Sequence, residues 1–220
     1  VLAGSLNAKG EVDPRIAMRA GVCAGLAGDR GAMDGALVTA APRAAEGWTA
    51  QGRLGFNYER RRGSVLAERI GERLLICKGA PEAILAVCDR RRDEQASVNL
   101  DDGARDTITA KLHSLAAQGL RAVAVATKAC ATPGDALAPG DEADLIFEGF
   151  CTFADPPKES AGDALKRLAA AGVRVKVLSG DDPLVVARVA GLVGLNAGAM
   201  LAGSELATLS DEALAARVQS

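Results

Sequence analysis

The spacing of apolar runs changes near Leu145, and this change limits the possible folds more than any other feature of the sequence. Before it, two strand-like runs, Gly63–Ile70 and Glu72–Lys78, are separated by one glycine, which predicts an antiparallel hairpin. After it, strand-like and helix-like runs alternate, which is typical of parallel βαβ units. We therefore expect an α/β chain in two parts: an α+β domain with an antiparallel sheet over 1–150, and part of a parallel α/β domain over 151–220.

Further elements follow from apolar periodicity and from glycine and proline breakers. In the first part, helical spacing occurs in places within 1–40, and we expect helices over Pro81–Cys88 and Asp101–Gln118 and a strand over Arg121–Lys128. Loops or turns are expected over Ala41–Gly52, Arg90–Arg92 and Thr132–Gly140. In the second part, we expect strands over Leu145–Ala154, Val173–Leu178 and Met200–Leu201, and helices over Glu159–Ala171 and Pro183–Val193.

The composition is that of an ordinary globular chain. Apolar residues make up 49% and charged residues 25% of the 220 residues, and the net charge is −2, so no basic field indicates a nucleic-acid partner. No apolar run reaches the roughly 18–20 residues of a membrane span, and no signal peptide is visible, so we expect the chain itself to be soluble. Five irregularly spaced cysteines and one histidine indicate reduced thiols and no metal site.

An aromatic residue precedes a run of arginines at the start of the predicted hairpin. In the stretch Phe56-Asn57-Tyr58-Glu59-Arg60-Arg61-Arg62, the Phe56 ring can stack on a nucleobase, and a guanidinium such as that of Arg61 can pair with phosphate oxygens. The alternative is a core phenylalanine beside a charged strand edge that resists aggregation.

Two further stretches place single basic residues at the ends of strands. In Cys77-Lys78-Gly79-Ala80-Pro81-Glu82, Lys78 ends a strand, Gly79 permits close approach of a ligand, and a helix begins at the proline. The chain contains no Gly-Lys dipeptide, so this is not a Walker A loop. Arg121 lies at the start of a buried strand. An ordinary Lys-Gly turn and a solvated charge are the respective alternatives.

In the second part, two polar stretches follow the ends of predicted parallel strands, the edge at which open α/β sheets bind ligands. They are Asp155-Pro156-Pro157-Lys158 and Ser179-Gly180-Asp181-Asp182. The Ser179 hydroxyl and the following backbone N–H groups can hold phosphate oxygens. The alternative for the second stretch is a turn that caps the next helix.

Together, and in this order, these stretches resemble the P-type ATPase family over about Asp34 to Val218. The matching patterns are Phe-x-x-(Asp/Glu)-Arg-(Lys/Arg) at Phe56, Lys-Gly-Ala-Pro-Glu at Lys78, Leu-Arg-x-(Leu/Val)-Ala at Leu120, Asp-Pro-Pro-(Arg/Lys) at Asp155, and Thr-Gly-Asp, present as Ser-Gly-Asp, at Ser179. In that family a nucleotide-binding domain is inserted into a phosphorylation domain of the haloacid-dehalogenase type. The arginine run and the region from Gly203 to Glu212 look most like bacterial magnesium-transporting members.

The resemblance implies a role for each matching residue. Phe56 would stack on adenine, Asp34 would occupy the acidic adenine-contacting position, Arg61, Lys78 and Gly79 would line the ATP pocket, and Arg121 would reach toward the phosphates. Ser179, supported by Asp181, would hold the transferred phosphoryl group, with Asp155 and Lys158 at the hinge between the domains. The departures are Gly63 in place of Met, Tyr58 in place of Arg, and Ser179 in place of Thr.

The resemblance also implies what the chain works with. We expect ATP and Mg²⁺ as cofactors, with the phosphorylation, actuator and transmembrane domains of the same pump as partners on the cytoplasmic side of the cell membrane. The phosphoryl-accepting Asp-Lys-Thr-Gly-Thr is expected upstream of Val1, so these 220 residues alone are expected to be inactive. Two alternatives stay open: a stand-alone nucleotide-binding or regulatory module, and a soluble phosphatase of the haloacid-dehalogenase type.

Overall fold

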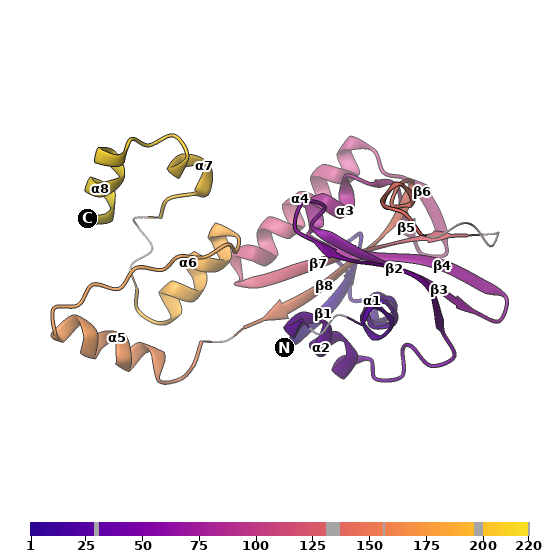
Figure 1. Ribbon diagram of the computed structural model, residues 1–220, viewed down its shortest axis with the longest axis horizontal. Helices are drawn as coiled ribbons and strands as arrows, with labels where there is room; N and C mark the ends of the chain where they lie inside the picture. The colour runs from indigo at the N-terminus through magenta and orange to yellow at the C-terminus, as the bar shows by residue number, and fades with distance from the viewer. Residues whose placement is uncertain (29–30, 131–136, 156, 196–199, 220) are drawn as a thin grey trace. The chain divides into compact units, whose positions relative to one another are not determined.

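The computed structural model describes residues 1–220 apart from 29–30, 131–136, 156, 196–199 and 220 (Figure 1). The chain divides into two compact units. The first consists of Val1–Leu115 with Leu120–Ala154, and the second of Ala116–Gly119 with Asp155–Ser220. The expected domain boundary after residue 150 therefore lies within the last strand of the first unit.

The first unit is built on a mixed but mostly antiparallel sheet of eight strands, counted over the described residues. The order is β2 (Thr49–Asn57), β3 (Arg62–Arg69), β4 (Glu72–Gly79), β7 (Leu120–Ala129), β8 (Leu145–Ala154), β5 (Cys88–Asp93) and β6 (Ala96–Asn99), with β1 (Leu2–Asn7) paired to β8. Neighbours are antiparallel except β5 and β8. The sheet confirms the predicted antiparallel α+β fold, and β3 and β4 form the predicted hairpin.

Helices cover both faces of this sheet (Figure 1). On one face lie α1 (Pro14–Ala27) and α2 (Ala32–Ala40), and on the other lie α3 (Pro81–Leu85) and α4 (Asp102–Ala117). Alternation along β4 divides its side chains between the two cores, with Ile76 facing α1 and Cys77 facing α3. Lys78 therefore projects from the face that carries α1 and α2.

Strand β8 changes partner along one edge, and a glycine makes this possible. Residues from Leu145 to Phe147 pair with β5, and residues from Gly149 to Phe153 pair with β1. Gly149 has φ 150°, and a Cβ there would lie 2.0 Å from the Leu6 carbonyl oxygen. Any other residue would separate β1 from β8, so the close approach of the two backbones requires glycine.

Three parts of the sheet differ from expectation. Strand β2 begins at Thr49, inside the expected loop, and β1 was not expected at all. The arginine run Arg90–Arg92 belongs to the β5–β6 hairpin, so the prediction of a solvated turn is wrong. The physical reason is charge pairing: Arg92 donates to the buried Glu148 at 2.9 Å, which lets a basic segment lie within a sheet.

The second unit contains α5 (Ala161–Ala170), α6 (Pro183–Leu192), α7 (Gly203–Leu206) and α8 (Asp211–Gln219). The strands predicted over Val173–Leu178 and Met200–Leu201 are wrong, since neither segment is a strand in the structure. A strand needs a neighbour for its backbone N–H and C=O groups, and every strand among the described residues belongs to the first unit. The alternating apolar residues of Val173–Leu178 therefore do not suffice to form a strand, and the side chain of Leu178 is almost fully exposed. None of the described helices is both long and apolar enough to cross a membrane.

Candidate functional site

Lys78 and Asp34, which the sequence placed in the same site, are in direct contact. Lys78 Nζ lies 2.6 Å from Asp34 Oδ1, and the two side chains are 14% and 13% exposed. Asp34 lies in the first turn of α2, and Lys78 precedes the last residue of β4. The ion pair therefore joins α2 to the sheet and holds the lysine side chain on that face.

Gly79 allows the turn before β3 to approach β4. It is paired with Arg62, and a Cβ on Gly79 would lie 2.4 Å from the Arg61 carbonyl oxygen. That oxygen accepts a hydrogen bond from the N–H of Ala80 at 2.9 Å. Arg61 has φ 52° and forms an exposed ion pair with Glu82 in α3. Two predicted stretches, the arginine run and the Lys-Gly segment, are thus in contact.

Phe56 lies on the surface at the end of β2. Its side chain is 53% exposed, so the interpretation as a core phenylalanine is wrong. Its ring packs edge to face against Tyr58, with centroids 5.4 Å apart and an interplanar angle of 88°. The backbone N of Phe56 would lie 3.1 Å from a Cβ on Gly63, and Gly63 is paired with Lys78. The backbones of Phe56, Gly63 and Lys78 therefore lie at neighbouring positions on three adjacent strands.

Arg121 projects from the same face of the sheet as Lys78. In the register of β4 and β7, Lys78 is opposite Val125, and Arg121 lies an even number of residues before Val125. At a rise of about 3.4 Å per residue, Arg121 is displaced along the strand by about 14 Å from the level of Lys78. The structure places the two cations on one face at a spacing that a single extended ligand can bridge.

Ser179 and Asp181 belong to the second unit. The backbone N–H of Asp181 donates to Ser179 Oγ at 3.1 Å, and Asp182 Oδ1 accepts from the Leu184 N–H at 2.8 Å at the start of α6. Asp182 therefore caps α6, in agreement with the alternative that this stretch is a helix-capping turn. The cap is provided by Asp182 and not by Asp181. Of the hinge stretch, Asp155 is exposed, and Pro156 lies outside the described residues.

Glu142 is a buried carboxylate next to the arginine run, and sequence reasoning missed it. It follows a short 3-10 turn, Pro139–Asp141, and its side chain is 0% exposed. Arg60 Nη1 donates to Oε1 and to Oε2 at 2.6 Å, Arg62 Nε donates to Oε2 at 2.7 Å, and Ser64 Oγ donates to Oε1 at 2.7 Å.

These contacts set the charge state of Glu142. Burial opposes ionisation, but the hydrogen bonds from Arg60, Ser64 and Arg62 outweigh it and hold the pKa of Glu142 below its usual range. The available signal in the sequence was the arginine run itself, because buried guanidinium groups need a carboxylate. Nothing in the sequence pattern indicated which carboxylate, about 80 residues away, would supply it.

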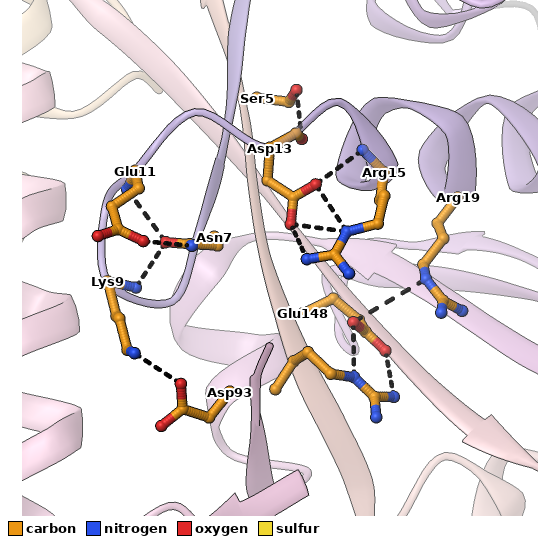
Figure 2. A network of polar contacts seen from close by, with 10 residues as sticks. Ser5, Asn7, Lys9, Glu11, Asp13, Arg15, Arg19, Asp93 and Glu148 are labelled. Atoms are coloured by element: carbon orange, nitrogen blue, oxygen red, sulfur yellow. Dashed lines mark hydrogen bonds and ion pairs between the residues drawn. The ribbon is translucent and has the colours of Figure 1, made fainter. Parts of the chain in front are cut away.

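A second polar cluster surrounds the start of α1 (Figure 2). Asp13 accepts the backbone N–H and the guanidinium of Arg15, while Arg19 and Arg92 face the buried Glu148. A cavity of about 100 Å³ lies here, lined by Asp13, Arg15, Ile16, Arg19, Arg92, Glu94, Gln95 and Glu148. The arginines and carboxylates neutralise one another, and none of the residues predicted for the nucleotide site lines it.

The comparisons with known proteins identify the family of the chain. The family model described as P-type ATPase, cytoplasmic domain N, matches residues 39–160, more than half of the chain. The chain belongs to the P-type ATPase family. The matched range includes the arginine run, the Lys-Gly segment, Arg121 and Glu142, that is, most of the first unit.

Two bacterial P-type ATPases show how far the similarity extends. "Magnesium-transporting ATPase, P-type 1" of Salmonella typhimurium is 43% identical over 189 residues, which cover 86% of this chain and 21% of the relative. The protein of the same name from Escherichia coli K12 is 43% identical over 188 residues. A plant relative, "Calcium-transporting ATPase 3, endoplasmic reticulum-type" of Arabidopsis thaliana, is 31% identical over 131 residues. The chain spans about a fifth of the length of the magnesium-transporting relatives.

Proposed function

We propose that the first unit binds ATP and that the chain is the cytoplasmic nucleotide-binding part of a cation-transporting P-type ATPase. The observation that carries the proposal is the alignment of Phe56, Gly63 and Lys78 across three adjacent strands. Neighbouring strands lie about 4.8 Å apart, so the backbones of Phe56 and Lys78 are separated by about 10 Å. One nucleotide can therefore contact both groups.

Each residue of the site has a chemical task in this proposal. The exposed face of Phe56 stacks on the base, and Asp34 provides an acceptor for the exocyclic amine while it also orients Lys78. Lys78 and Arg121 lie on one face and supply positive charge to the triphosphate, and Arg61 adds a guanidinium at the turn. Gly79 keeps this turn close to β4.

The residues of this chain suit ATP better than they suit a protein-bound metal ion. An exposed ring beside an ammonium and two guanidinium groups matches a base attached to phosphates. Among the described residues, no group of three or more His, Cys, Asp or Glu side chains could hold a metal ion. The described residues therefore do not form a Mg²⁺ site of their own.

The remaining parts of the proposal concern the whole pump. The relatives' names support magnesium as the transported ion. In the pump, the first unit would deliver the γ-phosphate of ATP to a catalytic aspartate elsewhere, with the phosphorylation, actuator and transmembrane domains as partners at the cytoplasmic side of the cell membrane. Ser179, supported by Asp181, would hold the transferred phosphoryl group, since a hydroxyl and backbone N–H groups suit phosphate oxygens.

Nucleotide titration of the 220-residue chain, followed by NMR chemical shifts, tests the proposal. We expect ATP to shift resonances of Phe56 and Lys78, and Phe56→Ala to weaken ATP binding by about 5- to 150-fold because base stacking contributes about 1–3 kcal/mol. Ile70→Ala is the matched control, because Ile70 is a fully exposed apolar residue at the β3–β4 turn. Equal ATP affinity in the wild type and in Phe56→Ala would contradict the stacking role.

A further inference from the structure

Glu142 is connected to the aromatic end of β2 through one arginine. Arg60 uses Nη1 to contact both oxygens of Glu142 and uses Nη2 to donate to the carbonyl oxygen of Gly55 at 3.0 Å. Gly55 directly precedes Phe56. A rigid guanidinium therefore spans the distance from a fully buried carboxylate to the backbone beside the exposed ring.

The same carboxylate also fixes the other side of the turn. Arg62 donates from Nε to Glu142 at 2.7 Å and from Nη1 to the Arg60 carbonyl oxygen at 3.3 Å. Between these two arginines, Arg61 is held in the left-handed region at φ 52°, where a residue with a Cβ is strained. The N–H of Arg61 donates to the Asn57 carbonyl oxygen at 2.7 Å, which closes the turn.

We propose that Glu142 is a positioning residue for the nucleotide site, which holds the Asn57–Arg62 turn so that the ring of Phe56 is presented to the base of the ligand. This inference rests on the proposed function. Glu142 does not touch the nucleotide, and it acts through Arg60 and Arg62. A carboxylate is suited to this task because its two oxygens accept four hydrogen bonds at once, whereas the carboxamide of a glutamine has one acceptor oxygen.

The first test compares two buried glutamates in the 220-residue chain. Glu142→Gln is expected to weaken ATP binding by about 3- to 10-fold, while binding of inorganic tripolyphosphate, which lacks a base to stack on Phe56, changes by less than about twofold. Glu148→Gln is the matched control, because Glu148 is equally buried and is held by Arg92 and Thr127, but does not contact the turn. This variant is expected to keep the wild-type affinity for ATP.

A double-mutant cycle separates positioning from a general loss of structure. If Glu142 acts through the ring, Glu142→Gln in a Phe56→Ala background has little further effect on ATP affinity. Additive effects of the two substitutions, or an unchanged ATP affinity in Glu142→Gln, would overturn the inference while leaving the proposed function intact. A wild-type chain that binds no ATP would overturn both.

A second variant covers the case in which Glu142→Gln does not fold. Arg60→Lys keeps a positive charge beside Glu142 but cannot contact the carboxylate and the Gly55 carbonyl oxygen together. It is expected to weaken ATP binding by about 3- to 10-fold. Arg92→Lys, at the other buried glutamate, serves as its control and is expected to leave ATP affinity unchanged.

Discussion

The ammonium of Lys78 lies 2.6 Å from a carboxylate oxygen of Asp34, and both side chains are mostly buried where α2 meets β4. This pair links the stability of the first unit to its proposed ligand site. Removal of the Lys78 ammonium leaves the Asp34 carboxylate without this partner in a poorly hydrated place. Effects on folding and on nucleotide binding must therefore be measured separately.

Lys78→Ala is expected to lower both the stability of the fold and its affinity for ATP. It should lower the free energy of unfolding by about 1–3 kcal/mol, because Asp34 is left unpaired, and it should weaken ATP binding because a cation is lost. The double variant Lys78→Ala with Asp34→Asn should recover stability but not the ATP affinity. Urea unfolding and ATP titration measure the two quantities.

Lys128→Ala is the control for this prediction. Lys128 lies on β7, the strand next to β4, and its ammonium contacts the Ala143 carbonyl oxygen and lies 3.9 Å from Asp144. It should leave ATP affinity unchanged. If Lys78→Ala kept full ATP affinity, Lys78 would have only the structural role of holding α2 on the sheet.

Lowering the pH should destabilise the fold, because protonation removes the charge of Glu142. Hydrogen bonds from Arg60, Ser64 and Arg62 overcome the effect of burial and lower the pKa of Glu142 from its ordinary value of 4.5. A carboxylate with a lowered pKa stabilises the folded state above the unfolded-state pKa, and this contribution is lost as pH falls from about 4.5 through the folded-state pKa.

The corresponding measurement is urea unfolding at several pH values between about 7 and 3. Glu142→Gln should cost about 3 kcal/mol at neutral pH, and the difference from the wild type should narrow as the pH falls. Asp163→Asn is a control, because Asp163 is exposed and paired only with Lys166 on the surface of α5. A difference between Glu142→Gln and wild type that stays constant with pH would contradict this account.

Thiol reactivity should distinguish one cysteine from the other four. Cys130 is partly exposed, whereas Cys23, Cys77, Cys88 and Cys151 are buried. Burial raises the pKa of Cys77 and of Cys151 to about 12, and it raises that of Cys88 further. Since the thiolate is the reactive form, iodoacetamide at mildly alkaline pH should modify Cys130 at least about tenfold faster than the others in the folded chain.

Peptide mass spectrometry of a labelling time course would show this order. Chain unfolded in urea should react at all five cysteines at similar rates, which serves as the control. Rapid native labelling of Cys77 or Cys151, which lie in the centre of the sheet, would mean that the sheet opens far more readily than its packing suggests.

The predictions from sequence were correct where a short stretch of neighbouring residues determines both the type of element and the place of a residue in it. Lys78 and Gly79 were placed at a strand end followed by a helix, and this arrangement is confirmed. The hairpin formed by β3 and β4 followed from two apolar runs around one glycine. Such features depend on residues close together in the chain, so a single sequence contains the information needed to find them.

Features that depend on distant partners were beyond a single sequence. Glu142 meets its arginines across about 80 residues, and β1 pairs with β8 across almost 150 residues. The segment Val173–Leu178 has the pattern of a strand, but a strand forms only when another segment satisfies its backbone. In each case the local pattern is compatible with several structures, and long-range pairing decides among them.

The 220-residue chain is expected neither to hydrolyse ATP nor to become phosphorylated. Phosphoryl transfer to protein needs a carboxylate positioned in line with the γ-phosphate. The sequence from Val1 to Ser220 contains no Asp-Lys-Thr-Gly segment. The aspartates of the second unit that remain as candidates are Asp155, Asp163, Asp181, Asp182 and Asp211.

The contacts of two of these aspartates argue against a nucleophilic role for them. Asp182 caps α6, and Asp163 pairs with Lys166 on an exposed helix. In the described part of the chain no third acidic or histidine ligand joins any pair of acids to hold a metal ion beside a transferring phosphate. Incubation with γ-labelled ATP and Mg²⁺, followed by acid quench and gel electrophoresis, should show no label on the chain, with an intact P-type ATPase run in parallel as the positive control. A label on the chain that survives acid and is released by hydroxylamine would identify an acyl phosphate on one of its carboxylates, and it would contradict this prediction.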